Sequence, residues 1–361
     1  METGDAPRRS ARRLLIALLV ALVIPAPAVA AEGGSAAGRQ STSPVVGQGV
    51  AESSEEAEGI RDFWTRERMR EARPVDVAPG GRFKRPGDPD ASVSEGRPAF
   101  VAPTRRGSSG HAALETGTIA ARRSGGRRRL SHVPFDRYEV PDTTAYPNRT
   151  NGRLLLRQGG ATFACSATVV TSEIKSLVFT AGHCLHDGGR RGDFASKVVF
   201  VPGYRDGQRP FGTFVARRIV VTDGWADGAN SNFDVGAAEL RRNGVGQKVE
   251  PAVGSRGIAF SQQREQLFRA YGYPAAPPFD GQRLFACESS YAGDDPNADP
   301  AGPPAMLIGC DLTAGSSGGS WVFGDGYVNS VISYSYEDVS DTYGPYFGRT
   351  VKRLWKSVAR K

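Results

Sequence analysis

The stretch TAGHCLH, residues 180–186, places a cysteine between two histidines. Three kinds of chemistry use such residues. His183, Cys184 and His186 would belong to a metal site if further ligands lay nearby. Cys184 would instead form half of a disulfide if the chain supplied a partner cysteine and met an oxidising compartment. His183 would act as a general base if the chain supplied a nucleophile and a carboxylate.

A glycine- and serine-rich stretch supplies a candidate nucleophile. Residues 311–321 read DLTAGSSGGSW. A serine hydroxyl becomes a good nucleophile only when a base removes its proton, and its turn must aim backbone N–H groups at the developing oxyanion. The glycines around Ser317 permit such a turn. Taken alone, a stretch of this composition is more often an ordinary loop.

Asp234 is the candidate carboxylate, within the stretch NFDVGAAEL at residues 232–240. A single aspartate ahead of apolar residues is usually a strand-end residue, so this signal is weak by itself. Together the three candidates follow the order His183, Asp234, Ser317 along the chain. That is the chymotrypsin order and differs from the orders in subtilisin and in the α/β-hydrolases.

These motifs together resemble the chymotrypsin-like (trypsin superfamily) serine peptidases, and among them the secreted bacterial members. The resemblance rests on TAGHC, the upstream FACSA at residues 163–167, FDVGAAEL and GSSGGSW, and covers roughly Val140 to Lys361. It implies that His183 is the base, Asp234 orients it and Ser317 attacks. The backbone N–H groups of Gly315 and Ser317 would form the oxyanion hole. It implies no cofactor and no metal.

Four cysteines, an even number in an exported chain, indicate two disulfides with three possible connectivities. Pairing sequence neighbours would close two loops of ~20 residues, each stabilising the fold by roughly 3 kcal/mol. The resemblance implies this pairing, Cys165 with Cys184 and Cys287 with Cys310. Cys184 would then be unable to bind a metal, and His186 would be a bystander.

The N-terminus has the pattern of a secretory signal peptide over residues 1–30. Four arginines precede the apolar run Leu14–Ile24, and small residues follow it. The run is shorter than the ~20 residues of a membrane-spanning helix. We therefore expect a secreted, extracellular protein with no stable membrane insertion after removal of the signal.

Residues 31–129 are rich in Gly, Pro, Ser, Glu and Arg. This composition predicts a disordered pro-segment or linker. Only Gly59–Ala72 suggests a short helix, and Arg127–Arg129 suggests a processing site. Release of the segment would control activity by steric or folding effects, because Ser316 stands where trypsin-like zymogens have an aspartate.

Short apolar runs punctuated by turn residues begin near Val140 and predict an all-β fold. The twelve runs are Arg153–Arg157, Phe163–Val170, Ser176–Thr180, Val198–Pro202, Phe214–Val221, Phe233–Ala238, Gly257–Phe260, Leu267–Tyr273, Leu284–Cys287, Ala305–Ile308, Trp321–Phe323 and Val328–Tyr334. For residues 140–361 the resemblance implies two antiparallel six-stranded Greek-key barrels with the site between them. Helical spacing of Val351, Leu354, Trp355 and Val358 predicts a C-terminal amphipathic helix docked on the barrel, with membrane-surface binding as the alternative.

The substrate pocket is less clearly marked than the catalytic residues. Asp311 stands six residues before Ser317, where trypsin holds the carboxylate that selects Arg or Lys, although an aspartate here need not face substrate. Ser333, Tyr334 and Ser335 resemble the pocket-edge segment that pairs with substrate backbone. Serine at position 335, where glycine is common, would favour small substrate side chains.

The expected function is a secreted serine endopeptidase acting on polypeptides as a monomer, with activity rising between about pH 5 and 8 as an imidazole loses its proton. The formal net charge of +8 raises the question of nucleic acid, but no aromatic interleaving supports base contacts. Two alternatives are a catalytically silent relative that binds anionic cell-surface polymers and an esterase on the same scaffold.

Overall fold

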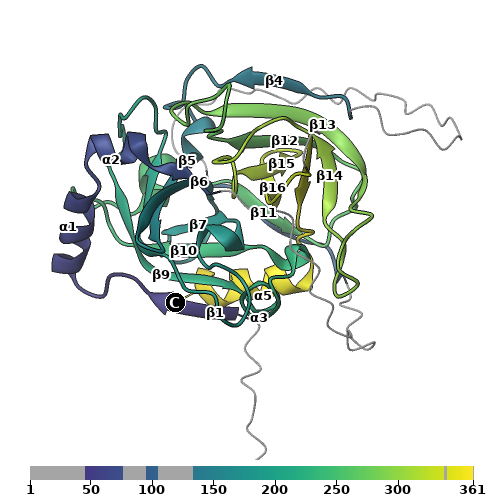
Figure 1. Ribbon diagram of the computed structural model, residues 1–361, viewed down its shortest axis with the longest axis horizontal. Coiled ribbons are helices and arrows are strands. Elements are labelled where there is room, and N and C mark those ends of the chain that lie inside the picture. The colour runs from purple at the N-terminus through teal and green to yellow at the C-terminus, as the bar shows by residue number, and fades with distance from the viewer. Residues whose placement is uncertain (1–44, 76–94, 105–132, 337–339, 361) are drawn as a thin grey trace, which may run out of the picture. The chain divides into compact units, whose positions relative to one another are not determined.

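The computed structural model describes residues 45–75, 95–104, 133–336 and 340–360 (Figure 1). The signal peptide predicted at residues 1–30 and the processing site predicted at Arg127–Arg129 lie outside the described residues. Each of the twelve predicted runs contributes a strand. These strands are β5 (Asn151–Gln158), β6 (Ala161–Val169), β7 (Leu177–Thr180), β8 (Ser196–Pro202), β9 (Phe214–Thr222), β10 (Gly236–Leu240), β11 (Gly257–Phe260), β12 (Leu267–Gly272), β13 (Phe285–Asp294), β14 (Met306–Gly309), β15 (Ser320–Phe323) and β16 (Tyr327–Val331).

Six of these strands close into an antiparallel barrel in the order β5, β6, β7, β10, β9, β8. The pairing of β5 with β8 and of β8 with β9 completes the circle. Strands β7 and β10 are buried at every position, although β-strands alternate their side chains between two faces. Both faces are covered, so these strands read as continuous apolar runs.

The second sheet has nine strands in the order β17, β14, β13, β12, β15, β16, β11, β3, with β4 paired to β13. Three of them were not predicted: β3 (Ala99–Val101), β4 (Asp136–Glu139) and β17 (Asp341–Gly344). The sheet thus departs in two respects from the six-stranded antiparallel barrel that the resemblance implies. It has additional strands, two of them from before Val140, and β11 pairs with β16 in parallel.

The prediction that residues 31–129 are disordered is wrong for residues 45–75 and 95–104. The first range forms β1 (Val45–Gly49), α1 (Ser54–Phe63), α2 (Arg66–Glu71) and β2 (Arg73–Pro74). The helices begin at caps, because the side chains of Ser53 and Thr65 accept N–H groups of the first turns. The segment has too few apolar residues for a core of its own, but Trp64 and Met69 are fully buried in the core of the folded unit.

The C-terminal helix α5 (Arg349–Ala359) confirms the prediction of a helix docked on the barrel. Val351, Leu354, Trp355 and Val358 are buried, and the helix packs against β9, β10 and β11. The Trp355 indole N–H donates to the Thr171 carbonyl at 3.1 Å. No helix within the described ranges has the length and apolar character needed to cross a membrane.

Candidate active site

His183 lies in the short 3-10 helix η2 (Gly182–Cys184), directly after β7. The preceding glycine is required by the packing. A Cβ atom at position 182 would lie 2.9 Å from Asp234 Oδ1 and 2.8 Å from Trp225 Cδ1. The absence of a side chain therefore lets the carboxylate reach the backbone beside the histidine.

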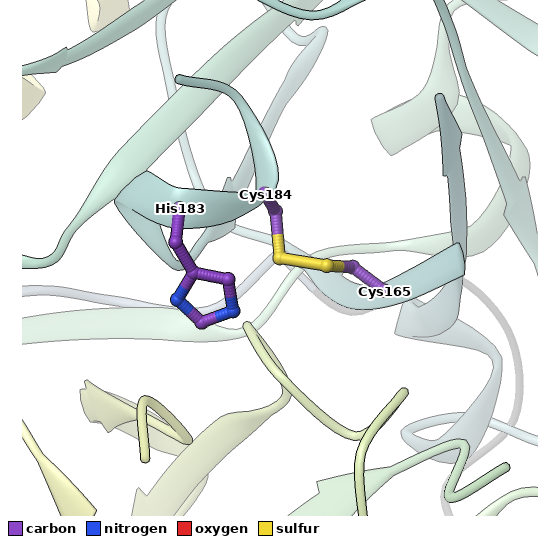
Figure 2. A group of neighbouring side chains, drawn as sticks. All are labelled: Cys165, His183 and Cys184. Carbon is purple, nitrogen blue, oxygen red and sulfur yellow. A yellow bond between two sulfur atoms is a disulfide. The ribbon is translucent and has the colours of Figure 1, made fainter. Parts of the chain in front are cut away.

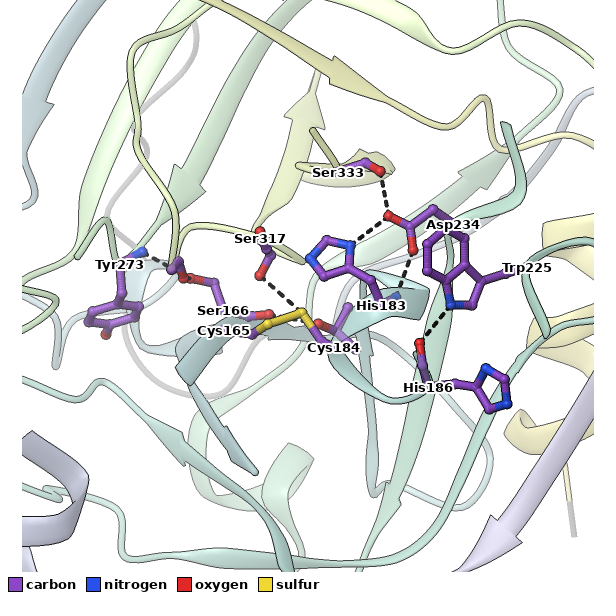
Figure 3. Close-up of a disulfide and its surroundings, with 12 residues drawn as sticks. Cys165, Ser166, His183, Cys184, His186, Trp225, Asp234, Tyr273, Ser317 and Ser333 are labelled. Carbon is purple, nitrogen blue, oxygen red and sulfur yellow. Dashed lines mark hydrogen bonds and ion pairs between the residues drawn. A yellow bond between two sulfur atoms is a disulfide. The ribbon is translucent and has the colours of Figure 1, made fainter. Parts of the chain in front are cut away.

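Asp234 follows the 3-10 helix η3 (Ser231–Phe233) and is buried behind the His183 ring (Figure 3). Its Oδ1 accepts the His183 backbone N–H at 2.7 Å, and its Oδ2 lies 2.7 Å from His183 Nδ1. The Ser333 hydroxyl donates to Oδ2 as well. A carboxylate can only accept, so Nδ1 carries a proton and Nε2 of the neutral ring is left as an acceptor.

The protonation of Asp234 is controlled by opposing effects. Burial alone raises the pKa of this carboxyl, but the charge of His183 and the hydrogen bonds from His183 and Ser333 outweigh burial. The net result is a pKa below the ordinary value of 3.8. Asp234 is therefore ionised at neutral pH, as a group that orients an imidazole must be.

Ser317 lies in a tight turn between β14 and β15, held by β6 of the first barrel. The Ser317 carbonyl accepts the Ser166 N–H at 2.7 Å, and the Gly315 carbonyl accepts the Ser166 hydroxyl at 3.0 Å. Gly318 has a φ of +80°, and a Cβ atom there would lie 1.9 Å from Thr180 Oγ1. Only glycine fits this position, so the turn sits directly against the strands that lead to His183.

The disulfide between Cys165 and Cys184 borders both His183 and Ser317 (Figures 2 and 3). A ring nitrogen of His183 lies within 4.8 Å of both sulfur atoms, and the Ser317 carbonyl oxygen lies 3.7 Å from Cys184 Sγ. The three candidate residues thus come from distant parts of the chain to one place. His183 Nε2 has no hydrogen-bond partner among the residues that the structure describes. The hydrogen bond from Ser317 to His183 that the resemblance implies is therefore not formed.

Both disulfides have the predicted pairing, which is thereby confirmed. The second joins Cys287 of β13 to Cys310, directly after β14. The sulfur atoms near His183 are bonded to each other, so neither is a thiolate able to bind a metal. His186 points away from the site in Figure 3 and packs edge-on against Phe194 at 4.6 Å between ring centroids. Burial lowers the pKa of His186.

The turn before the nucleophile has its own hydrogen bonds. The Ser316 hydroxyl donates to the carbonyl of Thr313 at 2.6 Å, and the Ser316 N–H donates to the same carbonyl at 3.1 Å. Within the described part of the chain, no hydrogen bond uses the N–H groups of Gly315 and Ser317.

The structure gives each candidate pocket residue a defined environment. The Ser333 hydroxyl contacts Asp234 and so supports the acid, whereas pairing of the segment's backbone with substrate stays a prediction. Tyr334 is buried, with its hydroxyl donating to Asp295 at 2.5 Å, whereas Ser335 is exposed. Asp311 is about one-third exposed and forms an ion pair with Arg137. No local sequence pattern links Ser333 to Asp234 or Arg137 to Asp311, because these pairs are far apart along the chain.

Two further residues near the site were missed in the sequence. The Trp225 indole N–H donates to the His186 carbonyl at 2.8 Å, which secures the loop after His183. Asn232 holds the loop before Asp234, because its side-chain amide donates to the Asp299 carbonyl at 2.8 Å and to the Ala301 carbonyl at 3.1 Å. Asn232 was part of the quoted motif, but nothing in the motif identified the distant loop as its partner.

Comparison with known proteins finds proteases among the solved structures that are similar to this chain. The chain is 35% identical to the protease Anisep from Arthrobacter nicotinovorans, with 62% of this chain and 99% of that one covered and a TM-score of 0.57. It is 38% identical to the thermostable serine protease AL20 from an extremophilic microorganism, with 58% and 97% covered and a TM-score of 0.54.

More distant matches add little. The chain is 27% identical over 107 residues to a protein of Bacillus subtilis (strain 168) named extracellular metalloprotease. It spans about a third of that protein's length, since the match covers 33% of it. No family model matches the chain.

Proposed function

The chain belongs to the chymotrypsin-like serine peptidases, and we propose that it is a secreted serine endopeptidase that cleaves polypeptides through an acyl-enzyme. One observation carries the proposal. A buried, ionised Asp234 holds His183 by two hydrogen bonds. The turn with Ser317 lies against the Cys165–Cys184 disulfide, which also borders His183. The two disulfides agree with an oxidising, extracellular location.

In the proposed reaction, His183 Nε2 takes the proton of the Ser317 hydroxyl as the oxygen attacks a peptide carbonyl. Asp234 keeps the Nδ1 proton in place and stabilises the imidazolium that forms. The N–H groups of Gly315 and Ser317 donate to the oxyanion. His183 then gives its proton to the leaving amine. In the second half of the reaction, His183 takes a proton from a water molecule that attacks the acyl group, and it returns a proton to the Ser317 oxygen as the acid product leaves.

The Ser317 hydroxyl must approach Nε2 in this mechanism, because that nitrogen has no partner in the described structure. Catalytic hydrogen bonds are often long without substrate and tighten in the reacting complex. The two hydrogen bonds from Ser166 to the carbonyls of Ser317 and Gly315 hold the backbone of this turn in place.

The proposal is tested by covalent labelling and kinetics. An organophosphonate should label Ser317 stoichiometrically, and Ser317→Ala should lose labelling and about 10⁴-fold or more in kcat on both a peptide and a small ester. Absence of labelling in the folded wild-type protein would favour a silent, polymer-binding relative. Labelling with ester hydrolysis but no peptide hydrolysis would favour an esterase.

Asp311 is proposed to influence the residue cleaved only after its ion pair with Arg137 is broken. Pairing with a guanidinium reduces its attraction for a substrate Arg or Lys. Arg137→Ala should therefore increase cleavage after Arg and Lys relative to Ala, Val and Glu. The double variant Arg137→Ala/Asp311→Asn is the matched control and should show no such gain, whereas an unchanged profile in Arg137→Ala would exclude Asp311 from the pocket.

A further inference from the structure

Residues 45–75, here called the N-terminal segment, pair at both ends with strands of the first barrel; Figure 1 shows β1, α1 and α2. Strand β1 pairs antiparallel with β9 over five residue pairs. Strand β2 pairs in parallel with β6, and the N–H group of Val75 donates to the Ala164 carbonyl at 3.2 Å. These main-chain bonds satisfy backbone groups of β6 and β9 that would otherwise be open to solvent.

Between the two strands, α1 and α2 place large side chains in the protein core. Trp64 and Met69 are both 0% exposed. The Trp64 indole N–H donates to the Lys197 carbonyl on β8 at 2.6 Å. Removal of the segment would expose the apolar surface of the barrel that these two side chains cover. An exposed apolar patch of this kind favours rebinding of the segment.

Arg153 of β5 supplies an independent reason for the segment to stay. Its side chain is buried, and Nη1 donates to the Met69 carbonyl of α2 at 2.7 Å and to the Tyr204 hydroxyl at 3.2 Å. Burial lowers the pKa of this guanidinium, which reflects the cost of the charge in this position. Without α2, the buried cation would lose its carbonyl partner.

We infer that the N-terminal segment is a permanent part of the folded protein and stays bound after the chain is cut between it and Val140. The first barrel therefore carries a docking surface whose partner is the chain's own residues 45–75. When the cut lies between residues 105 and 132, the N-terminal fragment also keeps β3, which pairs antiparallel with β11 of the second sheet. A mature protein made by such a cut would consist of two chains held together without a covalent bond. It would differ from a peptidase that has lost its pro-segment.

The test uses the full chain with a specific protease recognition sequence inserted between residues 105 and 132. After cleavage, both fragments should co-elute in size-exclusion chromatography at nanomolar concentration and separate only in guanidinium chloride. The melting temperature should fall by no more than a few degrees. Release of the N-terminal fragment under native conditions, with the remaining fragment melting at its former temperature, would overturn the inference. These readouts do not depend on whether the protein is a peptidase.

A matched pair of variants tests the named contact. Trp64→Ala should lower the melting temperature of the cut protein by about 10 °C, since truncation of a buried tryptophan leaves a large cavity. It should also increase release of the fragment at least tenfold. Glu58→Ala, at an exposed position of α1, the helix that Trp64 follows, should change neither quantity. Equal behaviour of the two variants would contradict the inference, and if Trp64→Ala does not fold, the cut wild-type protein still decides it.

Discussion

Replacement of Asp234 by asparagine tests the proposed chemistry most directly, because it changes charge and hydrogen bonding without changing shape. The carboxylate accepts from three donors, namely the His183 backbone N–H, His183 Nδ1–H and the Ser333 hydroxyl. An amide has one oxygen that accepts and one NH₂ group that donates. With its oxygen toward the His183 backbone, the asparagine presents its NH₂ group to Nδ1.

Nδ1 must then accept, so the ring proton moves to Nε2 and the nitrogen facing the nucleophile can no longer take a proton. In trypsin, the same aspartate-to-asparagine change lowers kcat about 10⁴-fold while the geometry is kept. A loss of this size corresponds to about 5.4 kcal/mol in the activation free energy. We expect a decrease of this order in Asp234→Asn with little change in KM, because the carboxylate contacts no substrate in the proposed mechanism.

The measurement is kcat and KM on a small ester, together with a thermal melt that verifies folding. Ser333→Ala is the matched control, since it removes one donor to the carboxylate and keeps both bonds to His183. One hydrogen bond to a charged group contributes about 1.5–3 kcal/mol, so this variant should lose roughly 10- to 100-fold. A folded Asp234→Asn protein with activity within tenfold of wild type would refute the proposed role of the aspartate.

The remaining predictions concern pH, packing and the disulfide. The pKa of Asp234 is lower in the folded protein than its ordinary value of 3.8. Its contribution to the free energy of unfolding is therefore complete above about pH 5 and is lost as the pH falls through the folded-state pKa. In urea titrations between pH 2 and 6, the free energy of unfolding should vary less with pH in Asp234→Asn than in the wild-type protein. Gly182→Ala would place a Cβ atom 2.9 Å from Asp234 Oδ1. This substitution should reduce kcat at least 100-fold and lower the free energy of unfolding by about 1–3 kcal/mol. Wild-type kinetics and an unchanged melting temperature would contradict this prediction. Replacing Cys165 and Cys184 together by serine should lower the free energy of unfolding by roughly 3 kcal/mol in urea titrations, and no change would mean that the bond does not restrict the unfolded chain.

Local patterns in the sequence were sufficient for much of the fold. Each of the twelve predicted runs overlaps a strand, because alternating or continuous apolar runs bounded by turn residues depend on neighbours along the chain. The helix at Arg349–Ala359 was predicted for the same reason. The resemblance then supplied the pairing of Cys165 with Cys184, which composition alone left among three possibilities.

The order of the sheets and the extent of the folded unit were not visible in these patterns. Trp64 and Met69 lie in a segment that appears too polar to fold, and they are buried only because the first barrel offers a complementary surface. The same holds for β3 and β4, which add to sheets formed by residues far along the chain.

By itself, the sequence determined which residues were chemically able to form the site: a histidine beside a glycine, an aspartate before a strand and a serine among glycines. These identities follow from residue type and local backbone freedom. Only the tertiary structure decided that Ser333 supports Asp234, that Arg137 pairs with Asp311 and that Arg153 depends on the carbonyl of Met69. Such contacts join atoms separated by 80 residues or more, and their energies depend on burial and distance, which exist only once the chain has folded.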